Sequence, residues 1–229
     1  MIKKISMALL GIVLAVACTK KQNSGTSAEN QVSTENEIVI GEYGSLSGAQ
    51  ATFGLSTHKG IKLAVDEANK KGGVKGKQLK LVEQDDQGKE TEVVTVVNRL
   101  INQYKAVAIL GEVASGLSLV AGPIAQQNKV PMISPSSTNP DVTKVGDYIF
   151  RVCFIDPFQG TVMAKFAYEN LKVKKVAVFK DVSLPYSKGL AEYFVKKFKE
   201  LGGEIVSEEN YSKDDKDFKA QLTKIRSAN

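Results

Sequence analysis

The sequence predicts an α/β fold in which parallel strands are covered by helices. Short apolar runs alternate with stretches of helical periodicity along most of the chain, which is the pattern of repeated strand–helix–strand units. The run 106–110 is apolar throughout, as expected for a strand that is buried on both faces. Two Gly-Gly pairs, at 72–73 and 202–203, each end a helical stretch just before a further strand.

The expected elements follow one another in a regular order. In the first part of the chain the apolar periods predict strands at 38–40, 79–82, 106–110 and 130–133, and helices at 61–68, 93–104 and 116–128. After an apolar run at 148–154 the alternation resumes. It predicts helices at 157–171, 186–201 and 218–225, and strands at 176–179 and 204–206.

The second half of the chain repeats the order of the first half. Each half has a strand, a loop with an aromatic residue (Phe53 or Tyr186), a helix, a Gly-Gly pair and a further strand. We therefore expect two doubly wound parallel-sheet lobes, a first lobe at 38–153 and a partial second lobe at 154–229. A ligand cleft between them would be formed by loops at the carboxyl ends of the strands.

The N-terminus predicts export from the cytoplasm. Lys3 and Lys4 precede an apolar run at 5–17 that is too short to span a bilayer and ends in small residues before Cys18. The segment ending in Cys18 resembles a lipobox, so we interpret 1–18 as a lipoprotein signal peptide with Cys18 as the lipidated residue. The alternative is an ordinary secretory signal that is cleaved nearby.

The next segment, 19–37, is rich in Ser, Thr, Asn, Gln and Lys and cannot bury enough apolar surface to fold. It predicts a flexible tether between a membrane anchor and the folded part. The protein would therefore lie in the periplasm or cell envelope, attached to a membrane through Cys18.

Composition argues against several functional classes. The formal charge of +6 includes Lys3 and Lys4 of the signal, and the other lysines are spread among acidic residues, so no nucleic-acid site is expected. The single histidine, His58, is expected at the start of a helix, at the surface or as a cap. Cys153, the one cysteine besides Cys18, is expected to be a buried small residue. Neither suggests a metal site or a cofactor.

Catalytic motifs are also missing from the sequence. There is no Gly-x-Ser-x-Gly elbow, no phosphate-binding loop and no cysteine beside a base, so we expect that the protein is not an enzyme.

Four segments together resemble the type I periplasmic solute-binding proteins, in the branch of the Leu/Ile/Val-binding protein. Their order and spacing agree with that family from about 38 to 225. The segments are Ile40-Gly41 with Leu46-Ser47-Gly48, Gly60-Ile61 through Val74 and Gly76, Ala108-Ile109-Leu110-Gly111 with Ser115, and Val130 through Pro140. The resemblance implies capture of an amino acid by closure of two lobes, on behalf of an ABC importer.

The resemblance also implies three ligand-binding positions in the first lobe. Ser115 matches a residue that holds the ligand α-carboxylate, at the start of a helix whose N–H groups favour an anion. Ser136 and Thr138 match positions whose backbone and hydroxyl groups contact the amino and carboxylate ends. The alternatives are a plain N-cap for Ser115 and a polar turn between Pro135 and Pro140 for the other two.

Three further positions are implied by the resemblance. Phe53 matches an aromatic residue that lines the pocket. Tyr186 matches a tyrosine that closes over the ligand, with local packing at a helix start as the alternative. Asp156 lies near an acid that some relatives use for the α-ammonium group, and a helix N-cap ahead of Pro157 is the alternative.

We further interpret the chain as truncated at its C-terminus, because the second lobe has few strands. The family's acidic partner for the ammonium group would lie beyond Asn229, and an amino acid without it buries a poorly compensated charge. The chain alone is therefore expected to bind weakly or not at all.

The expected function is the extracytoplasmic solute-binding component of an ABC importer for branched-chain or other aliphatic amino acids. Expected partners are the amino acid, an ABC permease in the inner membrane and the membrane itself through the lipid; the protein would be a monomer. The alternatives are a lipoprotein that senses amino acids, amides or urea for a membrane partner, and a truncated product that does not bind.

Overall fold

The computed structural model describes residues 36–228 of the chain. The predicted signal peptide, Cys18 and nearly all of the predicted tether therefore lie outside the described residues. Within the described residues, no helix combines the length and apolar character needed to cross a membrane.

Five parallel strands form the first sheet, in the spatial order β2-β1-β3-β4-β5. Because strand order reverses between β1 and β3, the carboxyl ends of these two strands mark the point where open α/β sheets bind ligands. The strands are β1 (Glu37–Gly44), β2 (Gln78–Asp85), β3 (Ala108–Leu110), β4 (Met132–Ser134) and β5 (Ile149–Arg151).

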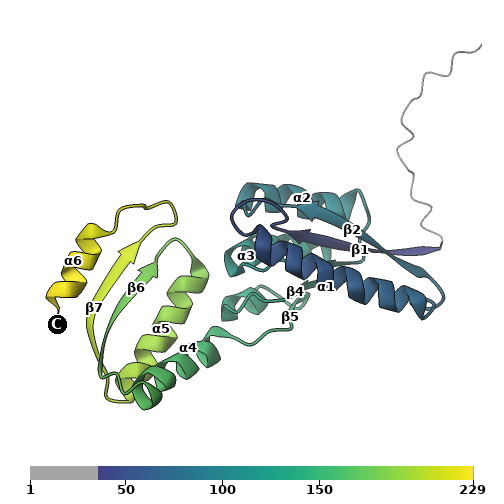
Figure 1. Ribbon diagram of the computed structural model, residues 1–229. Coiled ribbons are helices and arrows are strands. Elements are labelled where there is room, and N and C mark those ends of the chain that lie inside the picture. Colours follow the sequence, from purple (N-terminus) through teal and green to yellow (C-terminus); the bar gives the residue numbers. More distant parts are fainter. Residues whose placement is uncertain (1–35, 229) are drawn as a thin grey trace, which may run out of the picture. The chain divides into compact units, whose positions relative to one another are not determined.

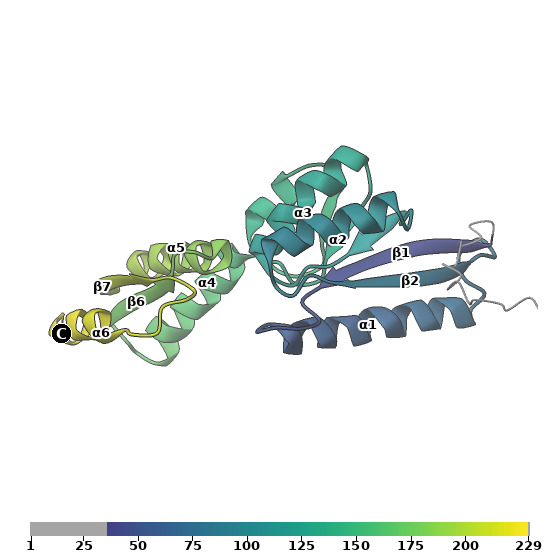
Figure 2. The same cartoon turned by 90° about the horizontal axis from the view of Figure 1, so that it is seen from above.

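Helices cover both faces of this sheet. Figure 2 shows α2 (Glu90–Asn102) and α3 (Ser115–Asn128) on the side of β1 and β2 opposite to α1 (Ala51–Lys70). The main core lies under α2 and α3, where Leu100 and Ile109 are fully buried. A Cβ on Gly41 would lie 3.1 Å from the Leu100 side chain of α2, so β1 packs closely under α2. Burying apolar side chains of this size contributes about 1.5–3 kcal/mol each.

The α1 face of the sheet is less completely covered. An apolar groove of about 580 Å³ lies there, lined by residues such as Ile40, Ile61 and Leu110. Only Gly54 and Val65 of α1 are buried. The helix starts at Ala51, ten residues before the apolar period that predicts it, because its first turns are largely exposed and carry no apolar stripe.

A second, two-stranded sheet pairs β6 (Lys175–Asp181) in parallel with β7 (Glu204–Tyr211). Beside it, α4 (Asp156–Lys165) continues into a π-helical turn at Phe166–Asn170 and packs along α5 (Pro185–Glu200), as Figure 1 shows. The last helix, α6 (Lys219–Ser227), packs on β7. Phe198 of α5 is fully buried, with its ring centroid 5.5 Å from that of Phe194 and 5.9 Å from that of Tyr168.

Each predicted strand and helix forms, with bounds that differ by a few residues except at the start of α1. Two elements were not predicted. One is β5, which lies in the apolar run 148–154, and the other is a 3₁₀ helix at Pro140–Lys144, at whose start the Asn139 side chain accepts the N–H of Asp141 at 2.9 Å. The prediction that Cys153 is buried is wrong, since its side chain is partly exposed. The apolar run continues beyond the strand: β5 ends at Arg151, and the flanking Val152 is 76% exposed.

Candidate functional site

The candidate site begins where β3 ends, at the reversal of strand order. Gly111 has φ of +121°, and a Cβ there would overlap the carbonyl oxygen of Tyr43 on β1. Only glycine fits both conditions. The chain can therefore turn sharply after β3 and bring the next residues to the start of α3.

Ser115 is the first residue of α3, not its N-cap. Ala114 occupies the N-cap position and provides no side-chain hydrogen bond, so the plain N-cap alternative for Ser115 is wrong. The Ser115 hydroxyl, 3% exposed, instead accepts the backbone N–H of Asn139 at 3.2 Å. A helix without a side-chain cap presents its first N–H groups, and the positive end of its dipole, to whatever lies in front of it.

Ser136 and Thr138 lie in the irregular segment after β4. The Ser136 hydroxyl donates a hydrogen bond of 3.4 Å to the carbonyl of Val113. Thr138 is 7% exposed, and within the described part of the chain its hydroxyl oxygen has no hydrogen-bond partner. Because buried polar groups are nearly always paired, an unpartnered hydroxyl here is compatible with a contact made only to a ligand.

Asp156 is the first residue of α4 and is completely buried. Ile155 is the N-cap, and no side chain caps the helix, so the N-cap alternative for Asp156 is wrong. Neither carboxylate oxygen has a hydrogen-bond partner among residues 36–228. Burial raises the pKa of this carboxyl; the nearby Thr138 hydroxyl and Arg151 guanidinium oppose that effect.

The two aromatic residues lie in the first turns of their helices. Phe53, in α1, is 65% exposed. Tyr186, in α5, is 39% exposed, and its hydroxyl accepts a hydrogen bond of 3.1 Å from Gln159 on α4. Local packing of Tyr186 therefore exists, while both rings keep exposed surface that could contact a ligand.

A cavity of about 420 Å³ lies in front of the α3 N-terminus. Ala114 and Gly116, on either side of Ser115, line it, and Gln50 lies ahead of α1. Residues after β6 and β7, among them Ser183 and Lys213, form another wall. The cavity is therefore lined by loops at the carboxyl ends of strands from both sheets.

Four of the six expected site residues lie in or are joined to the segment after β4. Ser115 accepts the N–H of Asn139, and the Thr138 carbonyl accepts the N–H of Asp156 at 2.9 Å. Ser136 lies in the same segment. No hydrogen bond within the described residues joins Phe53 or Tyr186 to the other four.

Sequence reasoning missed an acidic network behind the site. The Ser45 hydroxyl lies 2.8 Å from Glu112 Oε1 and 3.2 Å from Asp86 Oδ1, and all three residues are buried. A hydroxyl has one proton, so Ser45 donates to one carboxylate at a time. Each of the two oxygens also accepts a backbone N–H: that of Gly88 reaches Asp86 Oδ1 at 2.9 Å and that of Ser45 reaches Glu112 Oε1 at 2.8 Å. Burial and the Glu112 charge raise the pKa of Asp86 to about 7. The only sequence signal was two acids directly after expected strands.

Arg151 was also missed, although it organises the segment after β4. Its guanidinium donates to the carbonyls of Ser137 at 3.0 Å, Asn139 at 2.6 Å and Pro140 at 3.1 Å, and to the Thr143 hydroxyl at 2.6 Å. A fork of donors is well suited to hold several carbonyls at once. Its place in an apolar run gave no indication of this role.

Fold and site together define a class of protein: an α/β binding protein with a cavity at the carboxyl ends of parallel strands. A family model described as "Periplasmic binding protein" matches residues 37–229, and the chain belongs to this family. The predicted α/β fold of the type I periplasmic binding proteins is confirmed. The family comprises binding proteins rather than enzymes, which confirms that expectation as well.

Named relatives agree with this assignment. An amino acid binding protein of Pseudomonas aeruginosa is 37% identical over 84% of this chain and 51% of its own length. A Leu/Ile/Val-binding protein homologue of Brucella abortus is 36% identical over 84% of this chain and 52% of its own length. The chain thus spans about half the length of these curated relatives.

Solved structures show the same relationship. The leucine-binding protein LivK of Thermotoga maritima has a TM-score of 0.78 and 43% identity, covering 83% of this chain and 53% of that one. LivJ of Streptococcus pneumoniae, a branched-chain amino acid transporter substrate-binding protein solved with isoleucine, has a TM-score of 0.77 and 39% identity, covering 83% and 54%.

Proposed function

We propose that this chain is part of an extracytoplasmic solute-binding component of an ABC importer that captures branched-chain or other aliphatic amino acids. The names of its relatives support the ligand class, since they include Leu/Ile/Val-binding and leucine-binding proteins and a protein solved with isoleucine. The observation that carries the proposal is the N-terminus of α3, which lacks a side-chain cap and opens on the cavity.

In this proposal the α-carboxylate of the ligand binds at the α3 N-terminus. The N–H groups of Ser115 and Gly116 lie in the first turn, where no intrahelical carbonyl can pair with them. The Thr138 hydroxyl, buried and without a partner among the described residues, supplies a further donor. Anions at such helix ends are stabilised by about 0.3–1 kcal/mol when exposed, and by more when partly buried.

The α-ammonium group would bind toward the Ser136 carbonyl and Asp156. An isolated buried carboxylate is costly, and burial already raises the pKa of Asp156. An ammonium group nearby would favour the ionised carboxylate and offset part of that cost. Phe53 and Tyr186 would cover the aliphatic side chain of the ligand from the first and second lobes.

Closure of the two lobes would take place around the crossing between β5 and α4. Near it, the Asn139 amide donates to the carbonyl of Pro185 at 3.0 Å. A Cβ on Gly189 of α5 would lie 3.2 Å from Asp156 Oδ2 and 3.3 Å from Asn139 Nδ2. A glycine at this point lets α5 approach the acid that would bind the ammonium group.

For the whole protein we propose attachment to a membrane through a lipid on Cys18, with residues 19–37 as the tether. The partner would be an ABC permease, and the protein would act as a monomer. Metabolic labelling with a palmitate analogue tests the anchor, because Cys18→Ser abolishes the label if Cys18 is the lipidated residue and leaves it in place if another residue is.

The binding proposal concerns the whole protein, since the chain alone is expected to bind weakly or not at all, and it is tested by calorimetry of the whole protein with three matched ligands. L-Leucine carries both charged groups, leucinamide lacks the carboxylate, and isocaproate lacks the ammonium group. We expect each analogue to bind at least about tenfold more weakly than leucine, since each loses a charge-assisted contact of about 1.5–3 kcal/mol. Equal affinity for all three would show that the cavity does not recognise an amino acid.

A further inference from the structure

Three side chains with metal-binding groups converge on the α1 side of the first sheet, away from the α3 N-terminus. Glu42 of β1 and Glu83 of β2 are directly paired residues in the parallel register, so their side chains lie on the same face. His58, on α1, lies over the same face of the sheet. Its Nδ1 lies 2.9 Å from Glu42 Oε2 and 3.2 Å from Glu83 Oε2, and one ligand atom from each residue lies within 4.8 Å of the others.

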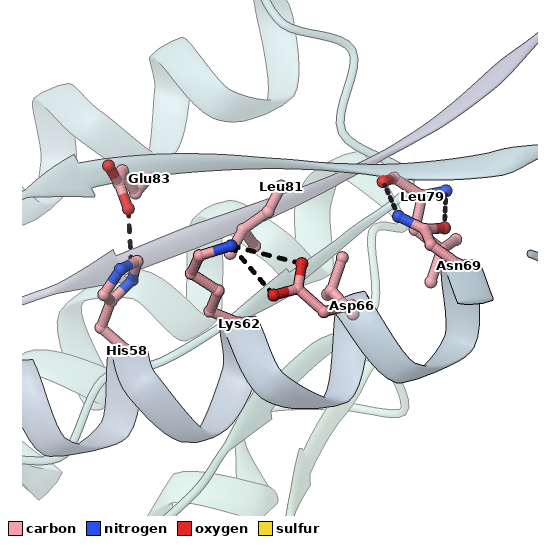
Figure 3. A pocket seen from close by; sticks show the side chains of 8 residues that line it. His58, Lys62, Asp66, Asn69, Leu79, Leu81 and Glu83 are labelled. Carbon is pink, nitrogen blue, oxygen red and sulfur yellow. Dashed lines mark hydrogen bonds and ion pairs between the residues drawn. The ribbon is translucent and has the colours of Figure 1, made fainter.

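These residues differ in their access to water. The Glu42 side chain is 2% exposed, the His58 side chain 21% and the Glu83 side chain 55%. Figure 3 shows His58 and Glu83 at one end of a cavity of about 390 Å³ between α1 and β2. The cluster therefore has a buried anchor and an open side that solvent can reach.

The charges of the cluster are unbalanced. Like charges on directly paired strand residues destabilise a sheet, and one protonated imidazole can neutralise only one of the two carboxylates. Lys62, the nearest other cation lining this cavity, already pairs with Asp66 at 3.0 Å, as Figure 3 shows. The cluster thus has room for one more positive charge.

We propose that Glu42, His58 and Glu83 bind a divalent transition-metal cation of the zinc type. One imidazole nitrogen and two carboxylate oxygens suit such an ion. Bonds of about 2.0–2.2 Å at tetrahedral angles place ligand atoms about 3.3 Å apart. The two measured separations, 2.9 and 3.2 Å, need only a small expansion to reach it.

The proposed site can neutralise the charge of the cation and complete its set of four ligands. The cation takes the place of the hydrogen on His58 Nδ1, which moves to Nε2 when the ring is neutral and to solvent when both nitrogens are protonated. Two carboxylates with a neutral imidazole then neutralise the double charge of the cation. The cavity beside Glu83 can supply a water molecule as a fourth ligand. The ion would link α1 to β1 and β2. It would thereby hold α1 on a face of the sheet that this helix covers incompletely.

The test uses the purified, metal-free chain and zinc or cobalt ions. We expect calorimetry to show one zinc ion per chain with micromolar affinity, and cobalt to give the visible absorption of a site with one nitrogen and two oxygen ligands. The substitutions Glu83→Gln and His58→Asn should each weaken zinc binding at least about tenfold. Glu83 is half exposed, so its substitution should leave the fold intact.

Two variants serve as controls. Asp66→Asn removes an acid that lines the same cavity but lies outside the proposed ligand set. Cys153→Ser removes a partly exposed thiol that could bind zinc by itself. Both should leave the zinc affinity and the cobalt spectrum unchanged.

Two results would overturn the proposal. The first is no zinc binding at millimolar concentration by a folded chain, in which case the cluster is only a histidine–carboxylate ion pair. The second is binding that Asp66→Asn or Cys153→Ser weakens as much as Glu83→Gln does, because the zinc would then bind to scattered surface groups.

Discussion

The backbone N–H of Asp156 donates a hydrogen bond of 2.9 Å to the carbonyl of Thr138. This bond joins the segment after β4 to the first residue of α4. It also brings an unpartnered buried hydroxyl and a buried carboxyl to one place, since neither Thr138 Oγ1 nor the Asp156 oxygens have partners among residues 36–228. A backbone hydrogen bond therefore holds these two residues in position, while their side-chain oxygens have no hydrogen-bond partner among the described residues.

Replacing Asp156 by Asn should stabilise the ligand-free protein at neutral pH. The pKa of Asp156 in the folded protein is raised above its ordinary value of about 4. In acid the carboxyl is protonated and the stability of the folded state is fully retained. As the pH rises through the raised pKa, the buried group ionises and the folded state loses stability. We expect Asp156→Asn to unfold at higher urea concentration than the wild type at pH 8 and at the same concentration near pH 4. A stabilising effect of equal size at both pH values would contradict an ionisation effect.

The substitution Asp86→Asn tests the acidic network by the same comparison of variant and wild-type unfolding, here over a defined range of pH. Because the pKa of Asp86 is raised to about 7, its contribution to stability should be lost between about pH 4 and pH 7. Asp86→Asn should therefore gain on the order of 4 kcal/mol over the wild type at pH 8 and almost nothing at pH 4. Urea denaturation across this range measures the difference, and a flat difference would show that Asp86 does not titrate there.

Two glycines in helices should respond oppositely to alanine. A Cβ on Gly160 of α4 would lie 2.7 Å from the Tyr193 Cβ and 2.8 Å from the Phe194 nitrogen on α5, so Gly160→Ala should destabilise the protein by about 1–3 kcal/mol. A Cβ on Gly60 of α1 meets nothing within 4 Å, so Gly60→Ala should stabilise by up to about 1 kcal/mol. Thermal unfolding of both variants checks the two predictions. Melting temperatures that change in the same direction would contradict the close packing of α4 on α5 at Gly160.

The core under α2 should be sensitive to truncation. Leu100 is fully buried, and Leu100→Ala should cost about 2–5 kcal/mol in unfolding free energy. Leu222 of α6 is 55% exposed, and Leu222→Ala should cost well under about 1 kcal/mol. Similar losses in urea denaturation for the two variants would show that Leu100 is not packed as described.

The sequence was most informative where a local pattern decides the structure. The apolar period of α2 predicted its buried face, because apolar residues at helical spacing pack against the sheet together. The run 106–110 was predicted less well, since β3 begins at Ala108 and Val107 is 55% exposed. The start of α1 could not be predicted, because residues from Ala51 onward are largely exposed and carry no apolar stripe. The exposure of Cys153 was missed because it lies in an apolar run, which suggested burial, although this run extends past the end of β5 at Arg151.

Contacts between distant segments were beyond the sequence pattern. His58 was expected at the surface or as a cap, yet it lies inside α1 with its Nδ1 against Glu42. Its proximity to both carboxylates depends on the register of β1 with β2 and on the rotation of α1, and neither has a local signal. The acids Asp86 and Glu112 follow β2 and β3, the two strands that flank β1, and both lie within hydrogen-bond distance of the Ser45 hydroxyl after the end of β1.

The central claim is that the α3 N-terminus and Thr138 hold the carboxylate of an amino acid. The most direct measurement is a titration of the isotope-labelled whole protein with L-leucine, followed by backbone amide chemical shifts, because the chain alone is expected to bind weakly or not at all. Saturable shifts at Ser115, Gly116 and Thr138, larger for L-leucine than for D-leucine and reduced at least about tenfold in apparent affinity by Thr138→Ala, are the predicted result. Unmoved amides at these residues in a folded chain, or shifts centred elsewhere, would contradict it.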